Sequence, residues 1–130
     1  MGDFAADLFA RTPFATRLVQ EWSTRPESYV RRCAFAMIAR RAVSDRNATD
    51  AAFLRFFPTI HAAATDERNE VKKAVNWALR QIGKRNPALH AAAIAEAERL
   101  LELDSRSARW IARDALRELR SEAVRARVGA

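Results

Sequence analysis

Residues 71–85 read VKKAVNWALRQIGKR, and this stretch carries the clearest helical pattern in the chain. At 100° per residue its apolar side chains fall on one stripe, which is typical of a helix packed on a core. The stripe consists of Val71, Ala74, Val75, Ala78, Leu79 and Ile82. The opposite side of the same helix carries Lys73, Trp77, Arg80 and Lys84.

This outer side admits two interpretations. The first is a solvated charged face on which Trp77 packs against a neighbouring helix. The second is a positively charged binding surface, where Trp77 offers its ring for stacking or for a cation–π contact. The rest of the sequence has to decide between them.

Composition limits the classes of protein that the chain can belong to. Its 130 residues are 49% hydrophobic and 30% charged, which indicates a single globular domain rather than a disordered chain. Only 3 Gly and 4 Pro leave little material for a turn-rich β fold. Lysine and arginine number 23 against 16 acids, and the net charge of +7 favours a polyanionic partner such as nucleic acid. No apolar run approaches the roughly 18 residues of a membrane span, and the single Cys33 suits a reducing cytoplasm.

Helical patterns cover most of the remaining chain. Pro58 should kink the helix that contains it, and Asp66 should cap the central helix. Asp104 or Ser105 should cap the helix that follows them. The expected helices span residues 3–11, 13–22, 26–41, 50–63, 66–85, 87–101, 105–119 and, as a weak last turn or short helix, 122–128.

The inward pattern of the central helix occurs three times. Its members are Val30, Cys33, Ala34, Met37 and Ile38, then Val71, Ala74, Val75, Ala78 and Leu79, then Ala108, Ile111, Ala112, Ala115 and Leu116. From Val30 to Val71 is 41 residues, and from Val71 to Ala108 is 37 residues. Two helices per period of about 40 residues is the spacing of HEAT-type repeats. We therefore predict an all-α fold, a right-handed α-solenoid of about three HEAT-like helix pairs with seven to eight helices, forming one domain over residues 1–130.

Equivalent outward positions of the repeats should lie side by side on the concave face of such a solenoid. Arg32, Lys73 and Trp110 share one of these positions, and Trp77 shares another with Asp114. The predicted surface collects Arg32, Lys73, Trp77, Arg80, Trp110 and Arg117. A basic groove with two tryptophans favours the second interpretation, a surface that binds nucleic acid.

Other chemically active residues are expected to be structural. His61 and His90 lie on different helices without the spacing of a metal site, so we predict neither a metal nor a cofactor. Cys33 and Trp22 fall on apolar stripes and should belong to the core. Asp114 stands near Arg113 and Arg117, which favours an ion pair over catalysis. Trp110 could cover the end of the solenoid or line the groove.

The blocks VKKAVNWALRQIGKRN (71–86) and SARWIARDALREL (107–119), together with YVRRCAF (29–35), resemble the bacterial AlkD-like DNA alkylation repair family. The resemblance covers nearly all of the chain. It implies a fold of HEAT-like repeats and a DNA glycosylase that removes cationic N3- and N7-alkylated purines. It also implies that the lesion stays stacked in the duplex, without base flipping.

The resemblance assigns roles to particular residues. Arg32 matches a functional arginine of the family and Trp77 a functional tryptophan. The family's catalytic aspartate would fall on Gly2, and Asp3 stands one residue away, about 100° around a helix. The family's N-terminal repeats have no counterpart here, so we expect the chain to be the C-terminal part of a member or a late-start variant.

The resulting hypothesis is a cytoplasmic, monomeric DNA repair glycosylase that acts on double-stranded DNA, with Asp3, Trp77 and Arg32 as catalytic candidates. DNA would be bound by Arg32, Lys73, Trp77, Arg80, Lys84, Trp110 and Arg117. The alternative is a non-catalytic HEAT-like module that binds DNA or a protein partner.

Overall fold

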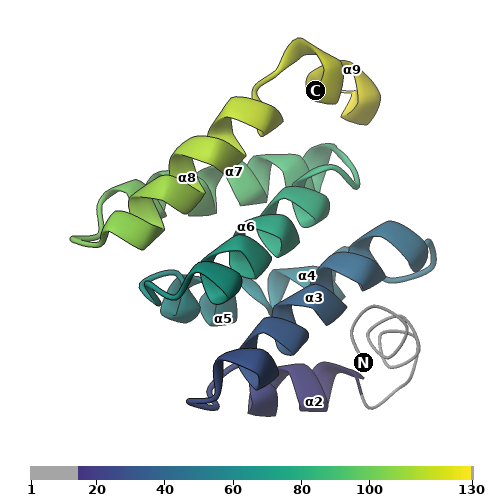
Figure 1. Ribbon diagram of the computed structural model, residues 1–130. Coiled ribbons are helices and arrows are strands. Elements are labelled where there is room, and N and C mark those ends of the chain that lie inside the picture. The colour runs from purple at the N-terminus through teal and green to yellow at the C-terminus, as the bar shows by residue number, and fades with distance from the viewer. Residues whose placement is uncertain (1–14, 130) are drawn as a thin grey trace.

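The computed structural model describes residues 15–129 as helices joined by short loops (Figure 1). The helix expected at residues 3–11, with Asp3, lies outside the described residues. Within the described range there is no strand, and the all-α prediction is confirmed. The helices are α2 (Ala15–Trp22), α3 (Ser28–Ser44), α4 (Asp50–Leu54), α5 (Phe57–Ala63), α6 (Asn69–Gly83), α7 (Pro87–Leu101), α8 (Arg106–Leu119) and α9 (Glu122–Val128).

The helices form two layers, as in an α-solenoid. Helices α3, α6 and α8 lie side by side in one layer, and α4, α5 and α7 lie behind them (Figure 1). Helix α2 packs against α3 at one end, and α9 follows α8 at the other. The second helix of each pair therefore contributes to one shared layer, as the repeat predicted.

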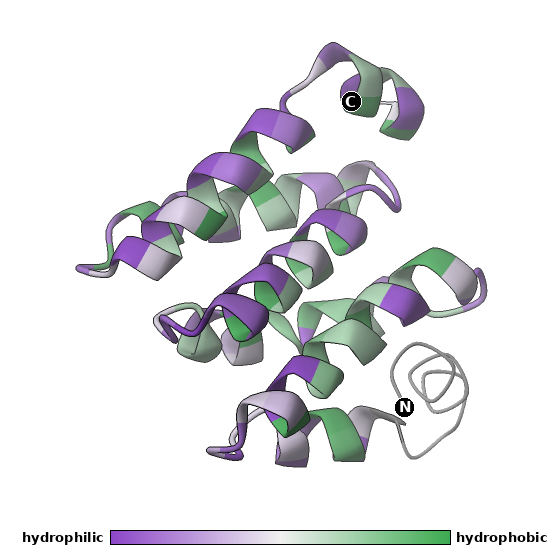
Figure 2. Ribbon diagram, viewed as in Figure 1, coloured by the Kyte–Doolittle hydropathy of each residue, from purple (hydrophilic) through white to green (hydrophobic). Residues whose placement is uncertain are grey.

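The core lies between the two layers, where the apolar sides of the helices meet (Figure 2). The predicted stripes of α6 and α8 are buried in full. In α3 the burial is different, because six consecutive residues from Ala34 to Ala39 are buried, while Val30 and Cys33 are only half-buried. Helix α3 packs against both α2 and α6, so more of its circumference is covered than a single stripe.

Two expectations about helix ends were wrong. The helix predicted at residues 50–63 is divided into α4 and α5 by a turn at Arg55 and Phe56, and Pro58 stands in the first turn of α5. Proline lacks an N–H, so it fits a first turn, where that donor needs no partner. Asp66 does not cap α6, whose N-cap is Arg68 without a side-chain hydrogen bond. Of the two residues predicted to cap α8, Asp104 and Ser105, the N-cap is Ser105. Its hydroxyl accepts from the Ala108 N–H.

The end of α6 packs closely on α7 and α8 at Gly83. A Cβ at this position would lie 2.7 Å from Leu119 Cδ2 and 3.0 Å from Ala93 Cβ. We expect Gly83→Val to lower the free energy of unfolding by about 1–2 kcal/mol, because overpacking outweighs the gain in helix propensity. Urea unfolding measures this, with Ala91→Val on the exposed side of α7 as the control. Equal stability of the two variants would contradict the close approach.

Candidate nucleic-acid interface

Three of the predicted site residues line one hollow between α3 and α6. We call it the α3–α6 hollow; its volume is about 440 Å³. It is lined by Arg32, Ala36, Asn69, Glu70, Lys73, Ala74 and Trp77. Helices α3 and α6 pack side by side, so an arginine from one repeat meets a lysine and an indole from the next. The structure therefore brings Arg32, Lys73 and Trp77 together, as the repeat pattern predicted.

Trp77 is held in place by its surroundings. Its side chain is half-buried and packs on the core, yet it also lines the hollow. The Arg40 guanidinium lies over the indole, 5.2 Å from the ring centroid, in a cation–π contact. The ring is thus fixed in position before any ligand arrives, so little side-chain entropy is lost on binding.

The two cations of the α3–α6 hollow are available for a ligand. Among the described residues, neither Arg32 nor Lys73 has an ion-pair partner, and Lys73 is exposed. A guanidinium can hold a phosphate with two parallel hydrogen bonds, and an ammonium adds a point charge. This arrangement suits one or two phosphates of a nucleic-acid backbone.

Glu70 is a lining residue that the sequence did not single out as functional. It stands in the first turn of α6 and brings a carboxylate to the α3–α6 hollow. Its pKa is lowered by a hydrogen bond with its own backbone N–H, and further by the Ser28 hydroxyl. The group is therefore ionised at neutral pH, close to Arg32 and Trp77.

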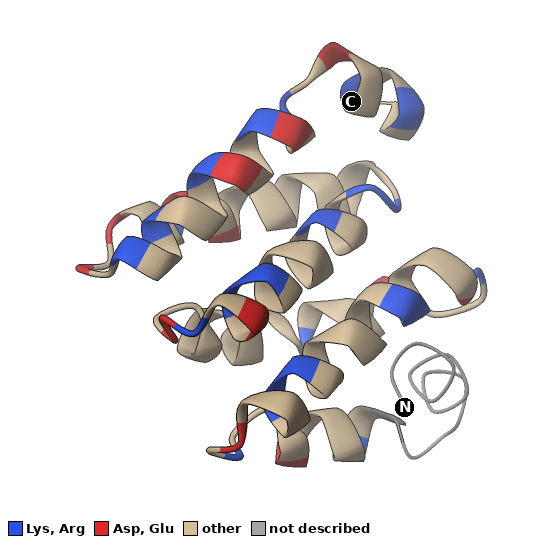
Figure 3. Ribbon diagram, in the orientation of Figure 1, with Lys and Arg blue, Asp and Glu red and all other residues tan. Residues whose placement is uncertain are grey.

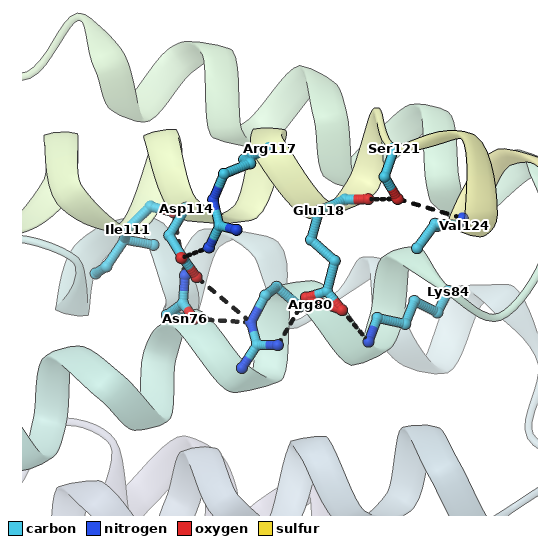
Figure 4. A network of polar contacts seen from close by, with 9 residues as sticks. All are labelled: Asn76, Arg80, Lys84, Ile111, Asp114, Arg117, Glu118, Ser121 and Val124. Carbon is cyan, nitrogen blue, oxygen red and sulfur yellow. Dashed lines mark hydrogen bonds and ion pairs between the residues drawn. The ribbon is translucent and has the colours of Figure 1, made fainter.

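Arg80 and Lys84 are engaged with α8 (Figure 4). Arg80 Nη1 donates to Glu118 Oε2 over 2.7 Å, and its Nε donates to Asn76 Oδ1 over 2.8 Å. The Lys84 ammonium pairs with the other oxygen of Glu118, and only 14% of the Lys84 side chain is exposed. Hydrogen bonds from these two cations outweigh the opposing effect of burial and lower the pKa of Glu118. Both residues were predicted to bind DNA, but in the structure both form ion pairs between α6 and α8.

Arg117 and Trp110 line a second hollow, between α6 and α8. This α6–α8 hollow has a volume of about 640 Å³. It is lined by Glu67, Lys72, Arg106, Ser107, Arg109, Trp110, Arg113, Asp114 and Arg117. Trp110 is exposed and lines this hollow. Asp114 accepts from Arg117, as expected for an ion pair.

Sequence reasoning missed four cations of this hollow, Lys72, Arg106, Arg109 and Arg113. Arg106 and Arg113 share one stripe of α8 with Trp110 and Arg117, at steps of four, three and four residues. That spacing could have identified both arginines. Lys72 is the residue before Lys73, and its partner Trp110 comes from another repeat, so only the packing of α6 on α8 reveals it.

Asp66 links the start of α6 to α3 and α8, the helices of the layer that carries both hollows. Its carboxylate accepts from Arg31 on α3 over 2.8 Å and from the guanidinium and backbone N–H of Arg68. Its backbone oxygen accepts from the Ser107 hydroxyl of α8 over 2.8 Å. The loop before α6 is thereby tied to both neighbouring helices, which fixes the position of Arg32 relative to α6.

This role predicts a pH dependence of stability. Hydrogen bonds, first from Arg68 and then from Arg31, lower the pKa of Asp66 from 3.8 to about 2. The ionised carboxylate therefore stabilises the fold above the unfolded-state pKa near 4, and this contribution disappears as the pH falls towards 2. We expect Asp66→Asn to cost about 1–2 kcal/mol at pH 6 and clearly less at pH 3. Urea unfolding at both values measures it, with the exposed Asp104→Asn as the control. An Asp66→Asn cost that is unchanged between these values would contradict the assignment.

The remaining candidates have structural contacts. His61 Nδ1 lies 2.8 Å from Glu96 Oε2, and His90 Nε2 lies 2.6 Å from the Leu119 carbonyl oxygen. Cys33 is half-buried, and burial raises the pKa of its thiol. Trp22 packs against the core. Over residues 15–129, no group of three His, Cys, Asp or Glu side chains could hold a metal ion, and no helix there is long and apolar enough to cross a bilayer.

Lysine and arginine positions recur along α3, α6 and α8 (Figure 3). This layer carries two basic hollows, each lined by a tryptophan. Fold and surface together define an α-solenoid with a candidate nucleic-acid interface. A family model described as DNA alkylation repair enzyme matches residues 1–119, so the chain belongs to this family of DNA repair proteins, and the resemblance found in the sequence is confirmed. No curated protein and no solved structure gives a significant match.

Proposed function

We propose that this protein is a DNA glycosylase that hydrolyses the N-glycosidic bond of cationic alkylated purines in duplex DNA. One observation carries the proposal. Arg32, Lys73 and Trp77, from two different repeats, line a single hollow in a member of a DNA alkylation repair family. Phosphate-binding cations beside a fixed aromatic ring suit a DNA strand whose sugar or base is positively charged.

The chemistry needs little from the protein at the leaving group. A purine alkylated at N3 or N7 already carries a positive charge, so it departs without a general acid. The sugar becomes oxocarbenium-like as the bond breaks, and an ionised carboxylate close to it stabilises that charge and orients water. The Trp77 ring adds a π face worth about 0.5–2 kcal/mol towards the same cation.

Two carboxylates are candidates for the stabilising role. The position given by the family falls near Asp3, which lies outside the described residues. Glu70 is the carboxylate within the described range that lines the α3–α6 hollow with Trp77. Neutral variants of both residues separate these candidates, because Glu70→Gln and Asp3→Asn each remove one charge with little change of shape.

Phosphate binding would come mainly from the cations that have no ion-pair partner among residues 15–129. Arg32 and Lys73 would position the strand, and neither can act as a base at neutral pH. Arg80, Lys84 and Arg117 are paired with Glu118 or Asp114, so their contribution would be long-range attraction rather than direct hydrogen bonds. The surface would then be selective for charge and not for sequence.

The test is release of methylated purines from alkylated duplex DNA. Release is expected from this chain or from a version extended upstream, and Trp77→Ala and the variant of the active carboxylate should reduce its rate. Tyr29→Ala, which removes an exposed aromatic residue outside both hollows, is the control. No release from the extended protein would reject the glycosylase.

A second function, a non-catalytic module that binds DNA, is favoured by the free cations themselves. Arg32 and Lys73 suffice for binding without any carboxylate in the correct place. This version predicts steeply salt-dependent affinity for duplex DNA without purine release, since each phosphate contact contributes about 0.9 to the slope of log K against log salt. A module for a protein partner need not show that slope.

A further inference from the structure

The α6–α8 hollow combines an exposed aromatic ring with cations. Trp110 has 39% of its surface exposed, more than either other tryptophan among the described residues. The Lys72 ammonium lies 4.9 Å from the centroid of its ring. The contact orients the indole without burying it, so the ring remains accessible for stacking.

The charge of this hollow is available for an anion. Five cations line it against two carboxylates. Both carboxylates are already engaged: Glu67 accepts from Ser105 and from the Ser107 backbone N–H, and Asp114 accepts from Arg117. Within residues 15–129, Arg106 and Arg113 are exposed and have no ion-pair partner.

We propose that the α6–α8 hollow binds an unpaired nucleotide of a DNA single strand, with its base stacked on Trp110 and its phosphate held by Arg106 and Arg113. A base inside a duplex is covered on both faces by its neighbours. An exposed indole therefore selects a base that has an uncovered face. The hollow's volume of about 640 Å³ lies within the roughly 300–1,000 Å³ of sites for small ligands.

The proposal rests on the DNA binding proposed above and extends it. Helix α6 separates the two hollows, and adjacent residues serve them, since Lys73 lines the first and Lys72 the second. A duplex on the α3–α6 hollow can therefore continue across α6 as a single strand. The protein would prefer damaged duplex next to a nick, gap or overhang.

Affinity measurements with two matched probes test this. A blunt duplex and the same duplex with a short thymidine overhang are compared by fluorescence anisotropy. The overhang is expected to raise affinity on the order of tenfold, the size of one base–aromatic stack. Trp110→Ala and Arg113→Ala should each remove most of this gain, measured for each variant as the ratio of its affinities for the overhang probe and the blunt duplex. Tyr29→Ala, which deletes an exposed aromatic residue elsewhere, should keep the gain.

The outcomes separate this proposal from the proposed function. If the blunt duplex binds but the overhang adds nothing, or adds as much to Trp110→Ala, the nucleotide site is wrong and the glycosylase proposal stands. If the blunt duplex does not bind, the proposed function fails. The nucleotide site in the α6–α8 hollow is then tested with short oligothymidylate alone. Protection of Lys72 from acetylation by that oligonucleotide would support the site, and unchanged reactivity would overturn it.

Discussion

Replacing Arg32 and Lys73 together with alanine is expected to weaken binding of duplex DNA on the order of 100-fold at low salt, because each charge-assisted hydrogen bond contributes about 1.5 kcal/mol at an exposed site. Both side chains line the α3–α6 hollow without an ion-pair partner among residues 15–129, so no described residue competes for them. The slope of log K against log salt should also fall by about 1.8 in magnitude, since two phosphate contacts are lost. Fluorescence anisotropy over a salt series measures both quantities.

A charge-matched control distinguishes contact from general attraction. Arg55→Ala/Arg125→Ala removes the same charge from exposed positions on α4–α5 and α9, outside both hollows. This control should change affinity only by the small effect of net charge. Equal losses in the two double variants would show that the α3–α6 hollow holds no phosphate.

Glu118→Ala is expected to lower the free energy of unfolding by about 2–3 kcal/mol, because two partly buried cations lose their shared partner. Arg80 and Lys84 both donate to this carboxylate, and their side chains are only 25% and 14% exposed. The loss should be somewhat below that of a fully buried pair, since water reaches part of the network. Urea unfolding at neutral pH measures it.

The control for this loss is Glu122→Ala, which removes an exposed carboxylate from the start of α9. A second variant tests the mechanism. Lys84→Met together with Glu118→Leu replaces the pair by apolar groups and should recover much of the stability lost in Glu118→Ala. A double variant as unstable as the sum of its single variants would mean that the network does not act as proposed.

The periodicity of the sequence predicted the fold because each helix of a solenoid buries the apolar stripe of its own sequence. The stripes of α6 and α8 are buried as expected, since each faces only the layer behind it and its neighbours in the repeat. Helix 50–63 was predicted as one unit because its apolar pattern is continuous. The kink expected at Pro58 is instead a turn at Arg55 and Phe56, which leaves Pro58 in the first turn of α5. The apolar pattern does not show where the backbone hydrogen bonds of a helix are interrupted.

The site could be predicted only in part, because its polar contacts join distant segments. Equivalent positions in the repeat were sufficient to place Arg32, Lys73 and Trp77 near one another. Pairing of Arg80 and Lys84 with Glu118 depends on the rotation of α8 about its axis, over 34 to 38 residues of sequence separation. Arginines and lysines serve both in binding surfaces and in structural ion pairs, so the sequence alone could not tell the two roles apart.

Lysine reactivity tests the central claim, that the α3–α6 hollow holds duplex DNA, most directly. The chain contains three lysines, and the structure places them in three situations: Lys73 in this hollow, Lys72 in the neighbouring one and Lys84 in the Glu118 pair. Acetylation read by mass spectrometry should show Lys73 strongly protected by saturating blunt duplex, and Lys84 reacting slowly with or without DNA. Lys73 reactivity that does not change when the duplex is bound would contradict the account.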